Sequence, residues 1–422
     1  MKVLVIGSGG REHTIVWKLT QSKSVNKIYI APGNAGTATI GENVDIKAED
    51  IDGLLEFALK NDIDMTVVGP EVPLVEGIVD RFREKGLRIL GPDKKGAKLE
   101  GSKAFAKEFM MKYNMPTARY EEYTDYDSAL KGLSKFGYPV VIKADGLAAG
   151  KGVLIPENEK EAIESLDTIM KDNKFGDSGK KVVIEEFLRG IEASMICFVD
   201  NNTIVPMVSA KDYKRALDGD KGLNTGGMGT FSPNTIVTEE LQHKINDEVL
   251  LPFMKGIKEE KMDFRGILFV GLMIDGEDIK ILEFNTRFGD PETQVILPRM
   301  KSDLYQVFDS IIDNKLCDQE ITWTDKKAIC IVATSGGYPE SYEKGKKILI
   351  DDKILKNEDL IIFHAGTKLH KNGIVTNGGR VLGVVALEDD LDSAREKSYN
   401  ALKSIKFEGL TYRRDIGYDM KK

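Results

Sequence analysis

A short run near residue 285 carries side chains that could bind a metal ion and a phosphate group. The mostly apolar stretch 279–282 leads into Glu283, Asn285 and Arg287, and a β-strand would place these three side chains on one face, about 7 Å apart per step. Because Mg²⁺ prefers hard oxygen ligands and shares them with substrate phosphates, Glu283 and Asn285 are candidate metal ligands. Arg287 could stabilise charge on a transferred phosphoryl group. The alternative is a solvated surface ion pair, and the carboxylates that follow in Asp290-Pro291-Glu292 argue against it.

The glycine-rich turn near the N-terminus, Gly7-Ser8-Gly9-Gly10, could bind phosphate through backbone N–H groups. It does not fit a dinucleotide-binding loop, because the third glycine of that pattern would fall at Glu12 and no acidic residue ends the second predicted strand. Two interpretations stay open. Either the turn holds a single phosphate with the help of Arg11, or it is a tight turn that requires glycine.

A second glycine-rich loop ends in Gly150-Lys151-Gly152. It is not a P-loop, because too few residues separate its glycines, Gly152 replaces the required Ser or Thr, and strands rather than a helix follow. A glycine turn between antiparallel strands can instead fold over a triphosphate as a flexible lid. Lys143, in the strand before it, would be costly to bury unless an anion meets it. A lysine that extends from an edge strand into solvent is the alternative.

The order of apolar and helix-period segments predicts where these groups lie. Before residue 100, strands alternate with helices, which predicts a parallel sheet with ligand loops at the carboxyl ends of its strands. The predicted strands are 2–6, 27–31, 65–68 and 88–90, and the predicted helices are 11–21, 51–60 and 75–85. After a helix that begins near Ser102, we expect antiparallel hairpins in 139–155 and 181–199, a helix over 239–259, and two long strands over 267–284. A last segment from Lys327 opens on a strand, 328–334, and carries glycine turns between short strands.

The composition excludes several classes of protein. With 422 residues, 41% of them hydrophobic and 30% charged, the chain should form about three domains of roughly 150 residues each. No apolar window approaches the roughly 20 residues of a membrane span, and three scattered cysteines give neither a disulfide framework nor a metal-ligand spacing. The net charge of -8 argues against a nucleic-acid binder. We therefore expect a cytoplasmic protein that acts on small molecules. A monomer is also expected, although neither composition nor charge indicates the oligomeric state.

Motifs along the whole chain resemble a known family. Lys103, Lys143, the strand Glu185-Glu186-Phe187-Leu188 and the Glu-x-Asn-x-Arg run stand in the order of the ATP-grasp superfamily. The narrower resemblance is to the phosphoribosylamine–glycine ligase family, also called glycinamide ribonucleotide synthetases. It rests on Gly-Gly-Arg-Glu-His near the start, Lys-Ala-Asp-Gly-Leu-Ala-Ala-Gly-Lys-Gly from Lys143, Asn-Thr-Gly-Gly-Met-Gly from Asn224, and Arg-Phe-Gly-Asp-Pro-Glu from Arg287.

This resemblance implies an α/β fold with an α+β centre. A Rossmann-like substrate domain would cover 1–100, an ATP-grasp domain 101–326 with a small lid at about 120–190, and a mainly β domain 327–422. The implied reaction converts glycine, ATP and 5-phosphoribosylamine into glycinamide ribonucleotide, ADP and phosphate, with Mg²⁺ or Mn²⁺. Glycine would attack the γ-phosphate to give glycyl phosphate, and the amine would displace phosphate. Neither step needs a protein nucleophile, because positioning and charge stabilisation carry both.

The resemblance also implies roles for individual residues. The ATP site would comprise Lys103, Lys143, Gly150, Lys151, Gly152, Glu185, Glu186, Phe187, Leu188, Glu192, Lys214 and Asn224. Adenine would lie against the backbone of Glu186 and Leu188 with Glu185 near its exocyclic amine, and Glu192 would bind the ribose. Arg287, Asp290 and Asp212 would act in catalysis, and Glu283 and Asn285 would hold the metal. The substrate site would comprise Gly9, Gly10, Arg11, Glu12, Asn34, Gly69, Glu71, Arg215, Thr225, Gly226, Gly227, Met228, Gly229, Pro291, Glu292 and Arg380.

Two features depart from the family pattern. Gly271 stands where many ATP-grasp enzymes carry a further metal carboxylate, so a second metal ion would need Asp212, Asp290, or phosphate and water. Lys211 and Tyr213 stand where relatives are expected to have Gln and His. For His364 and Arg380, contact with a ribose phosphate and simple packing stay open.

Three other functions stay as alternatives. Another ATP-grasp ligase or a carboxylase would release ADP in response to bicarbonate rather than glycine. A regulator that binds nucleotide without turnover would have no need for Glu283, Asn285 and Arg287 on one face. An oxidoreductase is disfavoured by the failed dinucleotide pattern.

Overall fold

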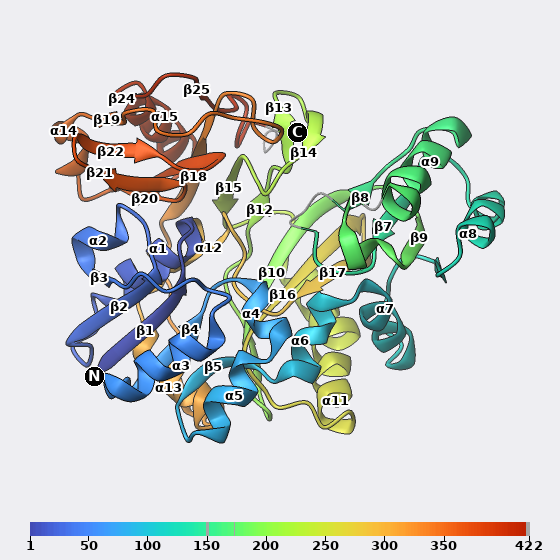
Figure 1. The fold of residues 1–422 in the computed structure, drawn as a ribbon, viewed down its shortest axis with the longest axis horizontal. Coiled ribbons are helices and arrows are strands. Elements are labelled where there is room, and N and C mark those ends of the chain that lie inside the picture. The colour runs from blue at the N-terminus through green and yellow to red at the C-terminus, as the bar shows by residue number, and fades with distance from the viewer. Residues whose placement is uncertain (149–151, 173, 419–422) are drawn as a thin grey trace.

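The N-terminal part is a parallel sheet between helices, drawn in blue in Figure 1. The computed structural model describes residues 1–148, 152–172 and 174–418. In order, the strands are β5 (Ile89–Pro92), β4 (Met65–Val68), β1 (Lys2–Gly7), β2 (Lys27–Pro32) and β3 (Glu42–Asn43). The helices are α1 (Gly10–Leu19), α2 (Thr37–Ile40), α3 (Ile51–Lys60), α4 (Glu71–Glu76), α5 (Ile78–Glu84) and α6 (Lys94–Gly101). Because β1 is central and covered on both faces, its residues 3–6 are fully buried.

The predicted N-terminal elements match the structure closely, with one exception. A single helix predicted over 75–85 is wrong, because the chain forms α4 and α5 in its place. Gly77 ends α4 with φ +93°, a left-handed conformation that interrupts a helix and favours glycine. The break lets α4 start at Glu71, directly after β4, at the carboxyl edge of the sheet.

The same sheet continues into the central region. β5 pairs antiparallel with β16 (Phe264–Asp275), and β16 also pairs with β10 (Ile191–Val199) and β17 (Asp278–Asn285). The predicted hairpin over 267–284 is thus confirmed. β11 (Ile204–Pro206) lies beyond β10, and the core on one face includes residues of α7 (Lys103–Lys112), α10 (Glu239–Ile245) and α11 (Leu251–Glu259). A π turn joins α10 to α11, so the helix predicted over 239–259 is confirmed.

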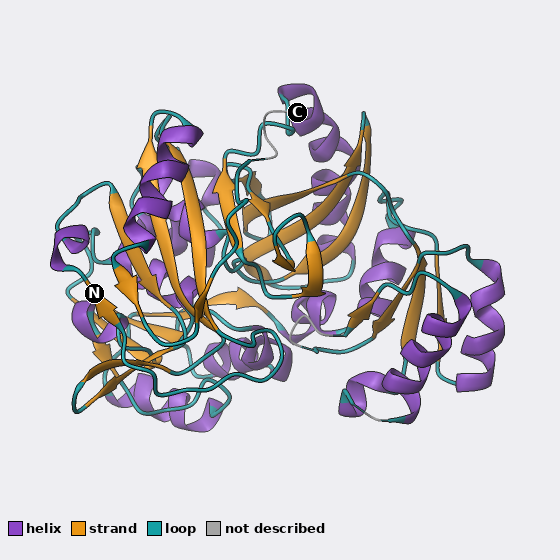
Figure 2. Cartoon of the chain, turned by 90° about the horizontal axis from the view of Figure 1, so that it is seen from above, coloured by secondary structure: helices purple, strands orange, loops and turns teal. Residues whose placement is uncertain are grey.

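A small separate sheet lies to one side of the molecule, as the view from above makes clear (Figure 2). Its strands are β6 (Tyr120–Tyr123), β9 (Val182–Glu186), β7 (Val140–Ala144) and β8 (Val153–Leu154), and α8 (Tyr126–Gly132) and α9 (Glu159–Leu166) pack on it. The hairpin predicted over 181–199 is wrong, because β9 and β10 belong to different sheets. Val182 and Ile184 are buried in the core of the small sheet, whereas Met195 and Cys197 are buried in the central core.

The C-terminal part is an antiparallel sheet, coloured orange to red in Figure 1, that two central strands extend. Its order is β12 (Lys211–Asp212), β15 (Gly229–Ser232), β18 (Lys327–Ser335), β23 (Arg380–Glu388) and β20 (Leu360–His364), with α15 (Leu391–Leu402) packed on it. The excursion between β12 and β15 forms a hairpin of β13 (Arg215–Leu217) and β14 (Lys221–Asn224). The other elements are α12 (Thr293–Ile296), α13 (Leu304–Ile312), α14 (Asp352–Leu355), β19 (Leu349–Ile350), β21 (Thr367–His370), β22 (Gly373–Thr376), β24 (Ile405–Lys406) and β25 (Leu410–Thr411).

The predicted α/β class with a mixed centre is confirmed. Among the described residues, no helix combines the length and the apolar character that crossing a membrane requires.

Candidate active site

The end of β17 brings Glu283, Asn285 and Arg287 together, as the strand period predicts. Asn285 Nδ2 donates to Glu283 Oε1 at 3.5 Å, and Arg287 Nη2 donates to Asn285 Oδ1 at 3.3 Å. Gly271 pairs with Glu283 across the ladder, and a Cβ atom at Gly271 would lie 3.4 Å from Glu283 Cγ. A carboxylate, an amide oxygen and a guanidinium therefore form one contiguous polar group.

Arg287 is oriented by a carboxylate that sequence reasoning missed. Glu100, at the end of α6, lies 2.9 Å from Arg287 Nη2, and its other oxygen accepts a hydrogen bond from Thr286 N at 2.7 Å. Glu71 approaches Arg287 Nε at 3.6 Å. Burial raises the pKa of Glu100 above its usual range, although Arg287 acts in the opposite direction. The only sequence signal for Glu100 is a glutamate at a buried position of a helix.

The Glu283 carboxylate is suited to a hard cation. Burial alone would raise its pKa, but the positive charges of Lys214, Lys143 and Lys103 lower the pKa below its usual value, so the side chain stays ionised. Among the residues that the structure describes, no group of three or more His, Cys, Asp and Glu side chains converges as a metal cage. One carboxylate and one amide oxygen fit Mg²⁺ that takes its remaining ligands from phosphate and water.

Two buried lysines share the carboxylate of Glu185. Lys143 Nζ lies 2.9 Å from Glu185 Oε1, and Lys107 Nζ lies 3.0 Å from Oε2. Glu185 is thus the anion that the buried Lys143 requires, and both of its oxygens are engaged inside the protein. Burial lowers the pKa of Lys107 to about 8. Lys107, which also donates to Thr117 Oγ1 at 2.7 Å, was not predicted from the sequence.

The other predicted nucleotide residues surround the junction of the small sheet with β17. Lys103 Nζ donates to Gly146 O at 3.1 Å, and Lys143 Nζ donates to Leu282 O at 3.3 Å. The side chain of Glu186 accepts from Arg119 N and pairs with Lys280. Its backbone N–H donates to Arg119 O at 3.0 Å, so adenine binding at this backbone stays a prediction. Phe187 is exposed and Leu188 half-buried. Gly152 O accepts from Ala144 N at 2.8 Å, while Gly150 and Lys151 lie outside the described residues.

Acidic groups surround Lys214 on the other side of Glu283. Lys214 Nζ lies 3.1 Å from Glu192, and the charges of Glu283, Asp212 and Glu292 also act on it. Asp212 Oδ1 is buried and has no hydrogen-bond partner among the described residues. Burial and the nearby Glu292 raise the pKa of Asp212 well above its usual value, and burial likewise raises the pKa of Glu292. Ser194 Oγ donates to Glu292 Oε1 at 3.0 Å, a contact that the sequence did not suggest.

The predicted residues of the N-terminal loops are engaged inside the protein. Glu12 accepts from Gly9 N at 2.5 Å and from Arg11 Nε at 2.6 Å, and Arg11 Nη1 donates to Phe288 O at 3.0 Å. Asn34 Nδ2 donates to Ser8 O at 2.9 Å. A Cβ atom at Gly69 would overlap the Glu12 side chain. These contacts shape the loop beside the site, and direct contact of these side chains with a substrate stays a prediction.

Arg380, at the start of β23 in the C-terminal part, contacts residues of the candidate active site. Its Nη1 donates to Gly226 O at 2.5 Å and to Asp290 O at 2.7 Å, and its Nη2 lies 3.4 Å from Asp290 Oδ2. Gln294 Nε2 donates to Asp290 Oδ1 at 2.7 Å. Burial raises the pKa of Asp290, but Arg380 and Arg11 lower it, and the net pKa lies below the usual value.

Two other predicted residues, His364 and Arg215, are hydrogen-bonded to neighbouring groups of the protein. His364 N donates to His13 Nδ1 at 2.8 Å, and His364 Nδ1 lies 3.1 Å from Thr367 Oγ1. Arg215 Nη1 donates to Gly222 O at 2.8 Å within the β13–β14 hairpin. The packing alternative left open for His364 therefore has the better support.

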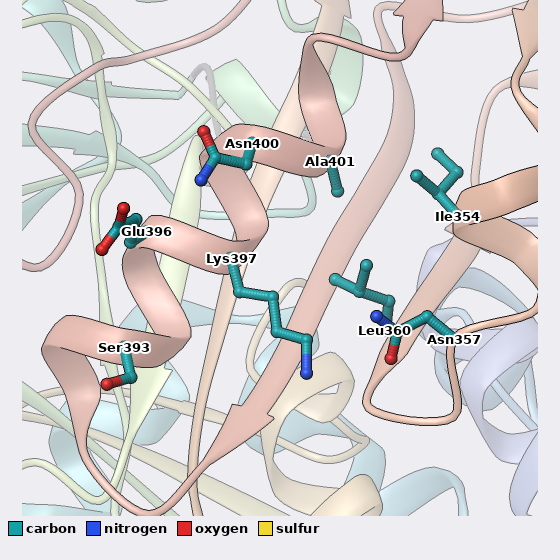
Figure 3. Close-up of a pocket in the computed structure, with 8 residues that line it drawn as sticks. All are labelled: Ile354, Asn357, Leu360, Ser393, Glu396, Lys397, Asn400 and Ala401. Carbon is teal, nitrogen blue, oxygen red and sulfur yellow. The ribbon is translucent and has the colours of Figure 1, made fainter.

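A surface hollow of about 450 Å³ lies elsewhere, between α15 and the loop before β20 (Figure 3). Lys397 extends into it and pairs with Asp359 at 3.1 Å and Glu388 at 2.5 Å. No predicted site residue lines the hollow. It is not part of the candidate active site.

Comparison with known proteins agrees with this geometry. Residues 101–293 match the family model described as "Phosphoribosylglycinamide synthetase, ATP-grasp (A) domain", residues 1–100 match its N domain and residues 328–419 its C domain. A 2-oxoglutarate carboxylase biotin carboxylase domain from Hydrogenobacter thermophilus, solved with MgADP and bicarbonate, has a TM-score of 0.76 at 16% identity over 97% of this chain and 91% of its own. The fold and the site thus define an ATP-grasp enzyme.

More similar proteins narrow the class. Phosphoribosylamine–glycine ligases from Clostridium acetobutylicum and Caldanaerobacter subterraneus are 52% and 50% identical to this chain, each over 99% of both chains. The crystal structure of phosphoribosylamine–glycine ligase from Thermotoga maritima has a TM-score of 0.87 at 36% identity and covers 98% of this chain and 100% of its own. The chain belongs to the phosphoribosylamine–glycine ligase family.

Proposed function

We propose that this chain is an ATP-dependent ligase that joins glycine to 5-phosphoribosylamine in purine biosynthesis. Its products are glycinamide ribonucleotide, ADP and phosphate. The observation that carries the proposal is the contiguous group of Glu283, Asn285 and Arg287 in a chain whose relatives carry that ligase name over their full length.

The reaction has two balanced steps. A carboxylate oxygen of glycine attacks the γ-phosphorus of ATP, so that glycyl phosphate forms and ADP leaves. The amine of phosphoribosylamine then attacks the glycyl carbonyl carbon, the C–O bond to phosphate breaks, and the amine loses a proton. Positioning and electrostatic stabilisation account for both steps without a protein nucleophile.

Glu283 and Asn285 would hold a Mg²⁺ ion, or Mn²⁺ in its place. When bound, the ion supplies positive charge to the phosphate oxygens of ATP. A second ion would take Asp212, Asp290 or phosphate and water, because the position opposite Glu283 is Gly271.

The cationic side chains bind the phosphates and the acyl phosphate. Lys103 and Lys143, with the loop ending at Gly152, face the triphosphate. Arg287, held by Glu100 at 2.9 Å, faces the transferred phosphoryl group, because a guanidinium spreads its charge over planar donors. Lys214 leaves Glu192, its partner at 3.1 Å, when the ribose hydroxyls take that carboxylate.

Asp212 and Asp290 would bind the amine of phosphoribosylamine and accept the proton that it loses. Asp212 has a buried oxygen without a partner among the described residues, and burial with the nearby Glu292 raises its pKa, which suits a carboxylate that accepts a proton. Asp290 lies between Arg380 and Gln294 and would meet the glycine ammonium or the incoming amine. Pro291 and Glu292, which follow Asp290 in the chain, would line the substrate site next to it.

We further propose the division 1–100, 101–326 and 327–422, with the lid at about 120–190, and a monomer in the cytoplasm. The small sheet that contains β6 to β9 supports the position of the lid. β15, in the second unit, pairs with β18, in the third. These two units therefore share one sheet.

Release of ADP tests the proposed reaction. Phosphoribosylamine is generated in the assay from ribose 5-phosphate and ammonia, and ADP is expected only when glycine and phosphoribosylamine are both present. A carboxylase of the same fold would release ADP with bicarbonate. Stimulation by bicarbonate with no response to glycine would refute the proposal.

A further inference from the structure

The loop from Thr225 to Met228 presents a backbone whose N–H groups are already bonded within the protein. Thr225 N donates to Lys214 O at 2.8 Å, Gly227 N to Thr225 Oγ1 at 3.0 Å, and Met228 N to Tyr213 O at 2.8 Å. Gly227 has φ +114°, so only glycine takes this turn without strain. The shape of the loop is therefore set by contacts on both of its sides.

Gly226 is exposed although both of its neighbours in the chain are buried. Its N–H group donates to Tyr338 Oη at 3.0 Å, and its carbonyl accepts from Arg380 Nη1 at 2.5 Å. Both partners come from the C-terminal part, Tyr338 from the loop after β18 and Arg380 from the first position of β23. Two side chains from outside the loop thus hold both polar backbone groups of its exposed residue.

Tyr338 is itself fixed in place by packing. A Cβ atom at Gly379 would overlap its ring, and the ring of Tyr342 lies against it with centroids 6.2 Å apart. Arg380, the residue after Gly379, also binds the backbone oxygen and the carboxylate of Asp290. The segment 378–380 therefore couples the loop at Gly226 to the turn that carries Asp290.

The β13–β14 hairpin, which precedes this loop in the chain, is held by residues of the C-terminal segment. Arg413, which is fully buried, donates to Arg215 O at 3.0 Å and to Asp220 at 2.7 Å. Asp415 accepts from Gly219 N at 2.7 Å. The hairpin is anchored at this end, and the contacts of Tyr338 and Arg380 hold the exposed residue of the loop, Gly226, at the other end.

We propose that Tyr338 is a positioning residue for the acceptor amine, because its hydroxyl holds the Gly226 amide and so fixes the loop 225–229 beside Asp290. This inference rests on the proposed function for the identity of the acceptor. Tyr338 acts through the loop and does not touch the reacting atoms. Arg380 was predicted as a direct substrate contact. Its guanidinium is instead bonded to Gly226 in the same loop and to Asp290 in the turn.

The first test needs no substrate. Tyr338→Phe removes only the hydroxyl, and Tyr342→Phe is the matched control, because the Tyr342 hydroxyl has no hydrogen-bond partner within the described ranges. Loss of a net hydrogen bond should raise hydrogen exchange at the Gly226 amide about 2- to 12-fold in Tyr338→Phe, with no change in the control. Equal exchange in both variants overturns the inference.

The second test is kinetic and uses the full chain. In Tyr338→Phe, the KM for phosphoribosylamine should rise about 2- to 12-fold, while the KM for ATP stays at the wild-type value. A merely structural role would instead move all KM values together, which would overturn the inference. A wild-type chain without glycine-dependent turnover would count against the proposed function alone, and the exchange result would still decide the role of Tyr338.

Discussion

Replacing Glu100 by glutamine should reduce turnover without removing any atom from the reaction itself. The Glu100 carboxylate lies 2.9 Å from Arg287 and accepts from Thr286 N at 2.7 Å. The amide oxygen of glutamine can keep the bond to Thr286 N, but the charge that orients Arg287 is lost. A hydrogen bond to a charged group is worth about 1.5–3 kcal/mol and a neutral bond about 0.5–1.5 kcal/mol, so the substitution costs about 1–2 kcal/mol.

If that cost falls on the transition state, kcat decreases about 5- to 30-fold. The assay is steady-state ADP release at saturating substrates, with urea unfolding measured on the same samples. Glu260→Gln is the control, because Glu260 pairs with Lys95 and Lys112 at the surface, where ion pairs contribute little. A kcat within twofold of wild type in Glu100→Gln would refute the account of how Arg287 is oriented.

Two further predictions concern the metal site and the pH dependence of stability. Glu283→Ala should lower kcat at least about 1000-fold but leave the dissociation constant for ADP, measured by calorimetry, within about threefold, because the adenine contacts are remote; near wild-type turnover would remove Glu283 from the mechanism. Burial lowers the pKa of His13 to about 3 and that of His364 to about 4 from 6.5, so the unfolded chain binds protons that the folded chain cannot, and stability is lost as pH falls below about 6.5. His13→Asn, which keeps an acceptor for His364 N, should remove about 1.4 kcal/mol per pH unit of this loss in urea titrations between pH 6.5 and 5, whereas exposed His243→Asn should not; equal slopes would contradict the assignment.

Local sequence patterns predicted the elements that carry the metal and phosphate residues. The period of a strand was enough to place Glu283, Asn285 and Arg287 together, because alternate side chains of one strand share a face whatever the strand packs against. The lysine at position 143 was correctly expected to need an anion, since burial of an unpaired charge is costly. The identity of that anion, Glu185, was not predicted.

Contacts between distant segments were not visible in the sequence. Glu100 and Lys107 lie on helices, where a buried charged residue resembles any exposed one until its partner is known. The pairing of β15 with β18 and the contact of Tyr338 with Gly226 depend on how separate parts of the chain pack. The separation of β9 from β10 was missed for the same reason, because local periodicity does not say which core buries a residue.

Oxygen transfer from glycine tests the central claim most directly. Glycine labelled with ¹⁸O in both carboxylate oxygens is incubated with ATP, phosphoribosylamine and the wild-type chain, and the released phosphate is examined by mass spectrometry. An acyl phosphate formed at the Glu283, Asn285 and Arg287 centre predicts one ¹⁸O atom in each phosphate and one in the amide of the product. Phosphate without ¹⁸O, formed while ADP is released, would contradict the account.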